Sequence, residues 1–304
     1  MRDPQVTRVG PLVSVLTPSF GQARWLADNL RSVEAQTYVP IEHVVMDGGS
    51  TDGSVRLLET RSRDGLIWAS EPDNGQSDAI NRAFAHSSGE ILGWLNSDDA
   101  YFSSAVVAQA VEVFETHPEV GVVFGHAALV NGDGTLLYVL WTPTFAPTLL
   151  RAYNVICQPT VFVRRSVIGR PYLVDPAFDY SMDRELLLHL ARRTRFFRLN
   201  RIVAIDRHHL QRKSLTRPDL ARHDRELIAQ RYRIPVLASN PVLHKAAKIV
   251  VRLGGLSKVM EAARGSDVLP LDVGSPREIA MRQVAQLRRW MPSGDLRDMP
   301  ESGP

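Results

Sequence analysis

Glu90-Ile91-Leu92-Gly93-Trp94-Leu95-Asn96-Ser97-Asp98-Asp99 is the stretch that decides the fold of this chain. Its first six residues are too apolar to alternate between two environments, which predicts a strand buried on both faces, as central parallel strands are. The strand ends in two adjacent carboxylates, Asp98 and Asp99. Open α/β sheets bind ligands at the carboxyl ends of their strands, so we expect a site at this edge.

Three further strands precede this one, and each is followed by a helical spacing of apolar residues. We expect strands at 13–17, 43–46 and 66–69, and helices at 25–36, 55–60 and 78–85. A helix at 105–117, a strand at 120–124 and the turn Asn131-Gly132-Asp133-Gly134 then indicate that antiparallel pairing begins. The sequence thus predicts an α/β, Rossmann-like mixed sheet, mainly parallel and flanked by helices.

The size and composition fit one large domain with an appendage. The 304 residues are 44% hydrophobic and 23% charged, which are ordinary values for a globular protein. Near residue 233 the pattern changes to helical segments separated by Pro and Gly. We expect an α/β domain over 1–235 and a C-terminal helical extension with a frayed end over 236–304.

Cellular location is predicted from what the sequence lacks. No apolar run approaches the roughly 20 residues that span a bilayer, and residues 1–10 lack the apolar core of a signal peptide. The single cysteine, Cys157, excludes an intrachain disulfide and suits a reducing compartment. We expect a cytoplasmic protein whose metal ligands, if it binds a metal, are oxygen or imidazole.

Basic residues are concentrated late in the chain. From 184 to 233 there are 14 Arg and Lys against 5 Asp and Glu. Such a run is a solvated helix face or a surface that attracts a diphosphate or an anionic membrane. The segment 245–253 could make peripheral membrane contact as an amphipathic patch, but packing on its own domain or on a second subunit in a homodimer is the commoner outcome for such a helix. We expect no nucleic-acid partner.

The acidic pair Asp98-Asp99 has two interpretations. Two carboxylates at a rigid edge repel each other unless a cation offsets their charge, and hard oxygen ligands suit Mg²⁺ or Mn²⁺. Alternatively, one aspartate caps the following helix and the other is solvated. No Gly-x-Gly-x-x-Gly follows the first strand and there is no phosphate loop, which disfavours dehydrogenases and P-loop kinases.

Four motifs together resemble the family 2 inverting glycosyltransferases of GT-A fold. They are Pro18-Ser19-Phe20, Asp47-Gly48-Gly49-Ser50-Thr51-Asp52-Gly53, Ser77-Asp78-Ala79-Ile80-Asn81 and Trp94-Leu95-Asn96-Ser97-Asp98-Asp99. The resemblance covers about residues 12–214. It implies transfer of a sugar from a nucleotide diphosphate to a hydroxyl of a glycan, a lipid-linked or a small-molecule acceptor, in polysaccharide biosynthesis.

The resemblance also assigns the donor side of the site. Pro18, Ser19 and Phe20 would line the base and ribose pocket. Asp47 would accept a hydrogen bond from a pyrimidine imide, which suggests a UDP-sugar or a dTDP-sugar. The alternative is that Asp47 and Asp52 only organise the turn and cap the next helix, which we expect of Asp52 more than of Asp47.

The next helix supplies three more expected donor contacts. Asp78 would meet the ribose or the donor sugar, with Asn81 and Arg82 one turn further on. An aspartate in a first turn also simply suits the helix dipole. We expect Ser77 to be the N-cap of this helix.

The resemblance gives the main metal ligand as Asp99, with Asp98 on the ribose or on metal-bound water. Asn96 departs from the family pattern, because it replaces the acid that opens a strict Asp-x-Asp motif. Downstream, Arg207-His208-His209-Leu210-Gln211-Arg212-Lys213-Ser214 is similar to the loop that closes over the diphosphate. His209 is the better match for a metal or diphosphate contact, and Arg207 and Lys213 would neutralise the leaving group.

The acceptor side is expected around Gln158-Pro159-Thr160 and the start of a later helix. Asp183 matches the family's catalytic base, with Glu185 as its nearest competitor, although acids are common at helix starts. Two other classes stay open. A sugar-phosphate nucleotidyltransferase would carry a Gly-rich basic loop after the first strand, which 18–24 lacks, and a non-catalytic nucleotide-sugar-binding protein would have lost the base.

Overall fold

A mixed nine-stranded sheet organises the residues described by the computed structural model, which are 10–143, 150–151, 154–213 and 218–234. The strand order is β3-β2-β1-β4-β8-β6-β9-β5, with β7 paired to β6. The strands are β1 (Val13–Ser19), β2 (Ile41–Asp47), β3 (Leu66–Ser70), β4 (Ile91–Trp94), β5 (Ala100–Tyr101), β6 (Val120–Asn131), β7 (Leu136–Leu140), β8 (Phe162–Arg164) and β9 (Arg195–His208).

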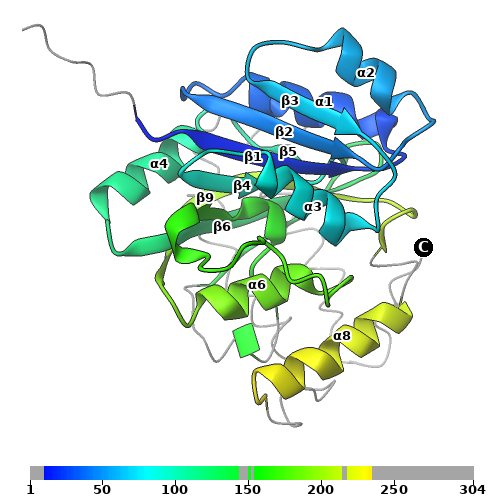
Figure 1. Ribbon diagram of the computed structural model, residues 1–304. Coiled ribbons are helices and arrows are strands. Elements are labelled where there is room, and N and C mark those ends of the chain that lie inside the picture. Colours follow the sequence, from blue (N-terminus) through cyan, green and yellow to red (C-terminus); the bar gives the residue numbers. More distant parts are fainter. Residues whose placement is uncertain (1–9, 144–149, 152–153, 214–217, 235–304) are drawn as a thin grey trace, which may run out of the picture.

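Helices cover both faces of this sheet (Figure 1). They are α1 (Ala23–Glu34), α2 (Ser54–Thr60), α3 (Gln76–Ala85), α4 (Val106–Thr116), α6 (Met182–Leu190) and α8 (Pro218–Arg231), with short 3-10 turns η1 (Gln158–Thr160) and η2 (Arg165–Val167). The core on one face joins strand residues to α3, α6 and α8, and the cores on the other face join them to α1, α2 and α4.

The apolar strand β4 lies inside the sheet, as its sequence predicts. All four of its residues are buried. It pairs in parallel with β1 and antiparallel with β8, so the continuous run of parallel strands that begins at β3 ends here, and β6 and β9 form a further parallel pair. The predicted α/β mixed sheet of GT-A type is thereby confirmed, and the hairpin of β6 and β7 forms at the predicted Asn131–Gly134 turn. The predicted extension over 236–304, with its segment 245–253, lies outside the described residues.

Of the two helix caps expected from the sequence, the one at α2 is confirmed and the one at α3 is wrong. Asp52 caps α2 by accepting from the backbone N–H of Ser54 at 3.1 Å, and it also accepts from the N–H of Ala23 in α1 at 2.8 Å. Ser77 is not a cap: α3 begins one residue earlier, after Gly75 at a φ of 104°. The Ser77 hydroxyl is buried and donates to the carbonyl of Phe178 at 2.7 Å instead.

Within the residues the structure describes, no helix combines the length and the apolar character needed to cross a bilayer.

Candidate active site

The carboxyl ends of β1 and β4 open into one large cleft, together with η1, the start of α6 and the end of β9. The cleft has a volume of about 1070 Å³. The structure brings seven of the predicted site residues to its walls: Pro18, Ser19, Phe20, Asp98, Asp99, Asp183 and Lys213. Six others do not line it, namely Asp47, Asp78, Asn81, Arg82, Arg207 and His209.

The acidic pair lies in the turn between β4 and β5 and is almost fully buried, with Asp98 at 9% and Asp99 at 3% exposure. Because β5 begins directly after Asp99 and α4 only at Val106, the helix-cap interpretation of the pair is wrong. The Asp99 carboxylate accepts from the backbone N–H of Arg207 at 3.1 Å. Both acids are therefore held at the cleft wall by the fold.

Negative charge accumulates around Asp99. Burial raises the pKa of Asp99 well above its ordinary value, and the charges of Asp98 and Asp206 raise it further. Burial also works against ionisation of Asp206, but the charge of Arg212 and the contacts with His208 and Cys157 together outweigh it and lower the pKa of Asp206 to about 2. Arg212 and Asp206 form an ion pair at 2.9 Å. One arginine thus offsets part of the charge of three carboxylates.

The hydrogen bonds of Asn96 explain why an amide stands where the family pattern has an acid. Its amide nitrogen donates to Asp99 at 3.1 Å and to Gln158 at 2.9 Å. Its oxygen accepts from Gln76 at 3.0 Å and from the indole of Trp94 at 2.9 Å. A carboxylate here would lose both donated bonds and add a like charge beside Asp99, so the amide holds Asp99 in place.

Arg207 lies beneath the acidic pair and not in the cleft. Its guanidinium donates to the carbonyl of Asp98 at 3.1 Å and to the carboxylate of Asp28 at 3.0 Å. Burial lowers the pKa of Arg207, while Asp28 and Asp99 oppose that shift. In this arrangement Arg207 supports the loop from inside.

The two adjacent histidines face opposite ways. His209 packs on Trp25 with ring centroids 3.9 Å apart, and its Nε2 is 2.9 Å from a carboxylate oxygen of Asp98. His208 lines the cleft instead, on the same side as Asp206. The sequence could have predicted these opposite orientations, because side chains alternate in an extended chain. This alternation places Asp206 and His208 on one side and Arg207 and His209 on the other.

Phe20, Gly48 and Asp73 lie close together on the cleft wall. Phe20 is 69% exposed there, an uncommon position for a large apolar ring. Asp47 lies behind this wall, and its carboxylate accepts four hydrogen bonds: from the N–H groups of Gly49 and Ser50 and from the hydroxyls of Ser50 and Ser70. Sequence reasoning did not single out Asp73.

The three predicted contacts on α3 make local bonds in the structure. Asp78 accepts from the backbone N–H of Asn74 at 3.0 Å and pairs with Arg82 at 3.0 Å, and these interactions lower its pKa. Asn81 bonds the backbone of Leu173 and Val174, which ties α3 to the loop before α6. These bonds organise the wall behind the cleft.

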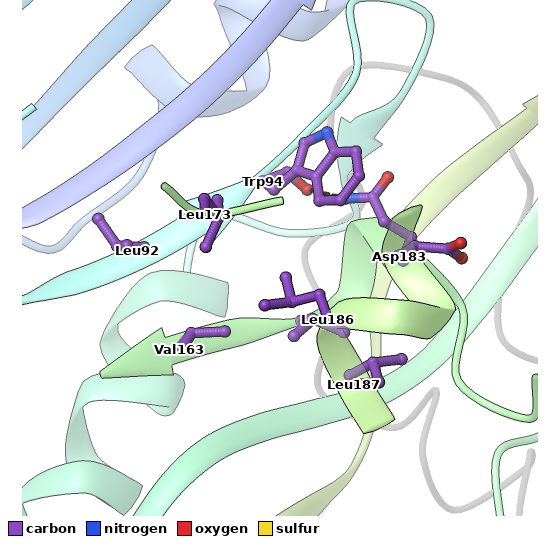
Figure 2. Close-up of a pocket in the computed structure, with 9 residues that line it drawn as sticks. Leu92, Trp94, Val163, Leu173, Asp183, Leu186 and Leu187 are labelled. Carbon is purple, nitrogen blue, oxygen red and sulfur yellow. Dashed lines mark hydrogen bonds between the residues drawn. The ribbon is translucent and has the colours of Figure 1, made fainter. Parts of the chain in front are cut away.

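Asp183 lies on the first turn of α6 and opens into the cleft. Figure 2 shows its carboxylate directed away from Trp94, Val163, Leu186 and Leu187, which together with Asp183 line a cavity of about 20 Å³. Asn154 donates to this carboxylate at 2.7 Å. Burial raises the pKa of Asp183, because desolvation outweighs the hydrogen bonds that it accepts.

Glu185, the competing acid, is enclosed in the protein. Its side chain is 2% exposed and forms an ion pair with Arg170 at 2.9 Å. It also accepts from the hydroxyl of Tyr232 at 2.7 Å. Because Glu185 does not line the cleft, Asp183 is the acid of α6 that a substrate can reach.

The donor atoms at the cleft can be compared with the needs of a divalent cation. The described residues contain no group of three or more His, Cys, Asp or Glu side chains arranged around a metal position. Asp98, Asp99 and His208 nonetheless line the same cleft. Hard oxygen ligands and an excess of negative charge suit Mg²⁺ or Mn²⁺, which bind through few carboxylates and leave positions to water and phosphate.

The sequence of the site segment matches a known family model. Residues 14–168, about half of the chain, match the model described as glycosyl transferase family 2. The chain belongs to this family. It is therefore a glycosyltransferase, and the resemblance stated from its motifs is confirmed.

Curated relatives agree with this membership. An uncharacterized glycosyltransferase of Mycobacterium tuberculosis is 35% identical over 184 residues, which are 60% of this chain and 69% of the relative. A PGL/p-HBAD biosynthesis glycosyltransferase of Mycobacterium bovis is 26% identical, over 52% of this chain and 61% of its own.

Solved structures share the fold at low sequence identity. TarS 1–349 of S. aureus in complex with UDP-GlcNAc gives a TM-score of 0.56 at 15% identity, covering 91% of this chain and 72% of the TarS 1–349 chain. Mannosyltransferase PcManGT of Pyrobaculum calidifontis, in complex with GDP-Man and Mn²⁺, gives 0.55 at 18% identity, covering 92% and 87%.

Proposed function

We propose that this glycosyltransferase moves a sugar from a UDP-sugar or a dTDP-sugar to an acceptor hydroxyl with inversion at the anomeric carbon. The observation that carries the proposal is that Asp183 and the Asp98-Asp99 pair line the same cleft. One acid can then take a proton from an acceptor while the other two lie where a nucleotide diphosphate would be held.

Asp183 acts as the general base in this proposal. Its carboxylate takes the proton of the acceptor hydroxyl as the oxygen attacks the anomeric carbon. The new glycosidic bond forms opposite the nucleotide, the bond from the anomeric carbon to the diphosphate oxygen breaks, and the nucleoside diphosphate leaves. A raised pKa makes Asp183 a stronger base than an ordinary aspartate, and such a base contributes about 10²–10⁴-fold to the rate.

Mg²⁺ or Mn²⁺ would be held by Asp99, with Asp98 and His208 at the same wall. When bound, it would offset the charge of the departing diphosphate as a Lewis acid. The sequence assigned the metal contact to His209, whose Nε2 is 2.9 Å from a carboxylate oxygen of Asp98, but only His208 lines the cleft. Arg212 and Lys213 also line the cleft and would add positive charge for the leaving group.

Asp47 remains our proposed acceptor for the pyrimidine imide. Its carboxylate can take that bond when one of the serine hydroxyls turns away, since each hydroxyl has other partners available in water. Asp73 is the second candidate, because it lines the cleft beside Phe20. TarS is a structure with a uridine donor and PcManGT one with a guanosine donor, so the shared fold leaves both kinds of base open.

The experiment is incubation of the full chain with UDP-sugars and Mn²⁺ in the absence of an acceptor. A transferase releases free sugar and UDP slowly, because water replaces the acceptor. The same incubation with Asp183→Asn should lose this release and keep donor binding. Binding without release by the wild-type protein would favour a nucleotide-sugar-binding protein, and formation of a new nucleotide sugar from a sugar phosphate and UTP would favour a nucleotidyltransferase.

A further inference from the structure

Arg184 and Arg225 line the cleft, and the proposed donor site uses neither. Arg184 follows Asp183 on α6, and Arg225 comes from α8. One nitrogen of Arg184 donates to the carbonyl of Arg151 at 2.6 Å. In the part of the chain that the structure describes, neither guanidinium forms an ion pair with a carboxylate within 4.0 Å.

A buried aspartate fixes the position of this pair. Asp224, at 1% exposure, accepts from the backbone N–H groups of Tyr180 at 2.8 Å and Ser181 at 2.7 Å. These bonds attach α8 to the start of α6. Since Arg225 is the next residue of α8, it is held beside the turn that carries Asp183 and Arg184.

The two arginines affect each other. Burial lowers the pKa of Arg184, the carboxylate of Asp183 opposes this shift, and the charge of Arg225 adds to it. The single carboxylate of Asp183 only partly offsets the two positive charges, and a bound anion would reduce the remaining cost in free energy.

The other cations of the cleft already have partners. Arg212 pairs with Asp206 at 2.9 Å, and Lys213 pairs with Asp179 at 2.6 Å. Among the described residues that line the cleft, the arginines without an ion-paired carboxylate are therefore Arg184 and Arg225, beside Asp183. In an in-line displacement the acceptor enters from the side of the base, opposite the nucleotide.

On the basis of the proposed function, we propose that the acceptor carries an anionic group, a phosphate or a carboxylate, that Arg184 and Arg225 bind while its hydroxyl lies at Asp183. Guanidinium groups form paired, charge-assisted hydrogen bonds with both kinds of oxyanion. Acceptor binding should accordingly weaken as salt is added.

The test uses the full chain saturated with UDP and Mn²⁺, so that the diphosphate position is filled. Three small probes of similar size are then compared by ligand-observed NMR: glycerol, glycerate and glycerol 3-phosphate. We expect the two anions to bind and glycerol not to bind. The stronger of the two anions distinguishes a carboxylate acceptor from a phosphate acceptor. Equal binding of glycerol, or no binding of either anion, would overturn the proposal.

Variants distinguish specific anion binding by Arg184 and Arg225 from a general effect of positive surface charge. Arg225→Gln and Arg184→Gln should each weaken anion binding about threefold to tenfold, the effect of one charge-assisted bond. Arg222→Gln is the matched control, because Arg222 is exposed on the same helix and does not line the cleft. An equal loss in the control would contradict the proposal.

UDP affinity distinguishes the two proposals. If wild-type protein fails to bind UDP, the proposed function fails and this inference falls with it. If UDP binds and the anions show no preference, only the anionic acceptor is excluded. If Arg225→Gln weakens UDP and leaves the anions unchanged, the arginines belong to the donor site and the inference is wrong.

Discussion

Arg207 and Asp28 are 179 positions apart in the chain, yet the guanidinium of one lies 3.0 Å from the carboxylate of the other beneath the acidic pair. Their side chains are 2% and 15% exposed. Through this contact, helix α1 supports the loop on which donor binding is proposed to depend.

Asp28→Asn should destabilise the protein. It removes the ion-pair partner of the buried Arg207, and breaking a buried pair typically costs about 3–5 kcal/mol. Urea denaturation gives the free energy of unfolding. The control is Arg24→Gln, which removes the exposed pair of Arg24 and Asp133 and should cost about 0–1 kcal/mol. Unchanged stability with weaker UDP binding would instead make Arg207 a donor contact, as the resemblance implies.

Asp183→Asn and Glu185→Gln should fail in different ways. Loss of the base should lower turnover by about 10²–10⁴-fold while donor affinity and stability stay near wild type. Glu185→Gln breaks the buried pair with Arg170, so its main effect should be a lower free energy of unfolding. Turnover, UDP affinity and urea denaturation, measured together, decide the assignment. A catalytic Glu185 would show the reverse pattern.

The pH dependence of transfer should reflect the environment of Asp183. Burial raises its pKa, so kcat/KM should fall with decreasing pH at a value above the usual aspartate range. The sign for stability is opposite: between the unfolded and folded pKa values the folded state binds more protons, so this group stabilises the fold less as pH rises. A pH profile of the residual activity of Asp183→Asn should lack the acid limb; its persistence would assign the limb to another group.

The two histidines should separate in a metal titration. His208→Ala should weaken Mn²⁺ binding to the UDP-loaded protein by about 10–100-fold if this ring faces the metal as its position in the cleft suggests. His209→Phe keeps an aromatic ring on Trp25 and removes the contact with Asp98, so a smaller effect on Mn²⁺ is expected. Asp99→Ala should abolish the Mn²⁺-dependent thermal shift by UDP. A larger loss in His209→Phe than in His208→Ala would restore His209 as the ligand.

Base recognition can be assigned with a second pair of variants. Asp47→Asn should weaken UDP binding roughly tenfold to a hundredfold if its carboxylate accepts the imide hydrogen, the range for a bond to a charged group. Binding of GDP would change little. Asp73→Asn is the comparison, because that carboxylate reaches the cleft directly. If only Asp73→Asn reduces the preference for UDP, the imide contact moves to Asp73.

Much of the fold could be predicted because its signals are local. The apolar residues of β4 and the turn residues after β6 carry their information within a few positions, and the cap formed by Asp52 lies two residues from its partner. The site at the strand ends follows from the same logic. This logic predicted that Asp98 and Asp99 lie at the ligand-binding edge, whereas Asp183, at a helix start, was predicted only from the family resemblance.

The missed features depend on contacts between distant segments. Nothing near Arg207 in the sequence indicates that its guanidinium pairs with Asp28. Nothing near Ser77 indicates that the Ser77 hydroxyl donates to the carbonyl of Phe178. Arg225 was seen only as one cation in a basic run, because its place in the cleft is set by Asp224. The choice between His208 and His209 was the exception, since strand periodicity was available in the sequence.

Asp224 has a consequence for how the enzyme is assembled. The family match ends at residue 168, so it includes the Asp98-Asp99 pair but neither α6 nor the residue that bonds its first turn. During synthesis on the ribosome, every residue proposed for the donor side, the last of which is Lys213, emerges before residue 224. We therefore expect a nascent chain to be able to bind a nucleotide before it can transfer a sugar. The measurement is UDP binding and the release of free sugar from UDP-sugars by ribosome-arrested chains of increasing length. Binding should appear at a shorter chain length than release.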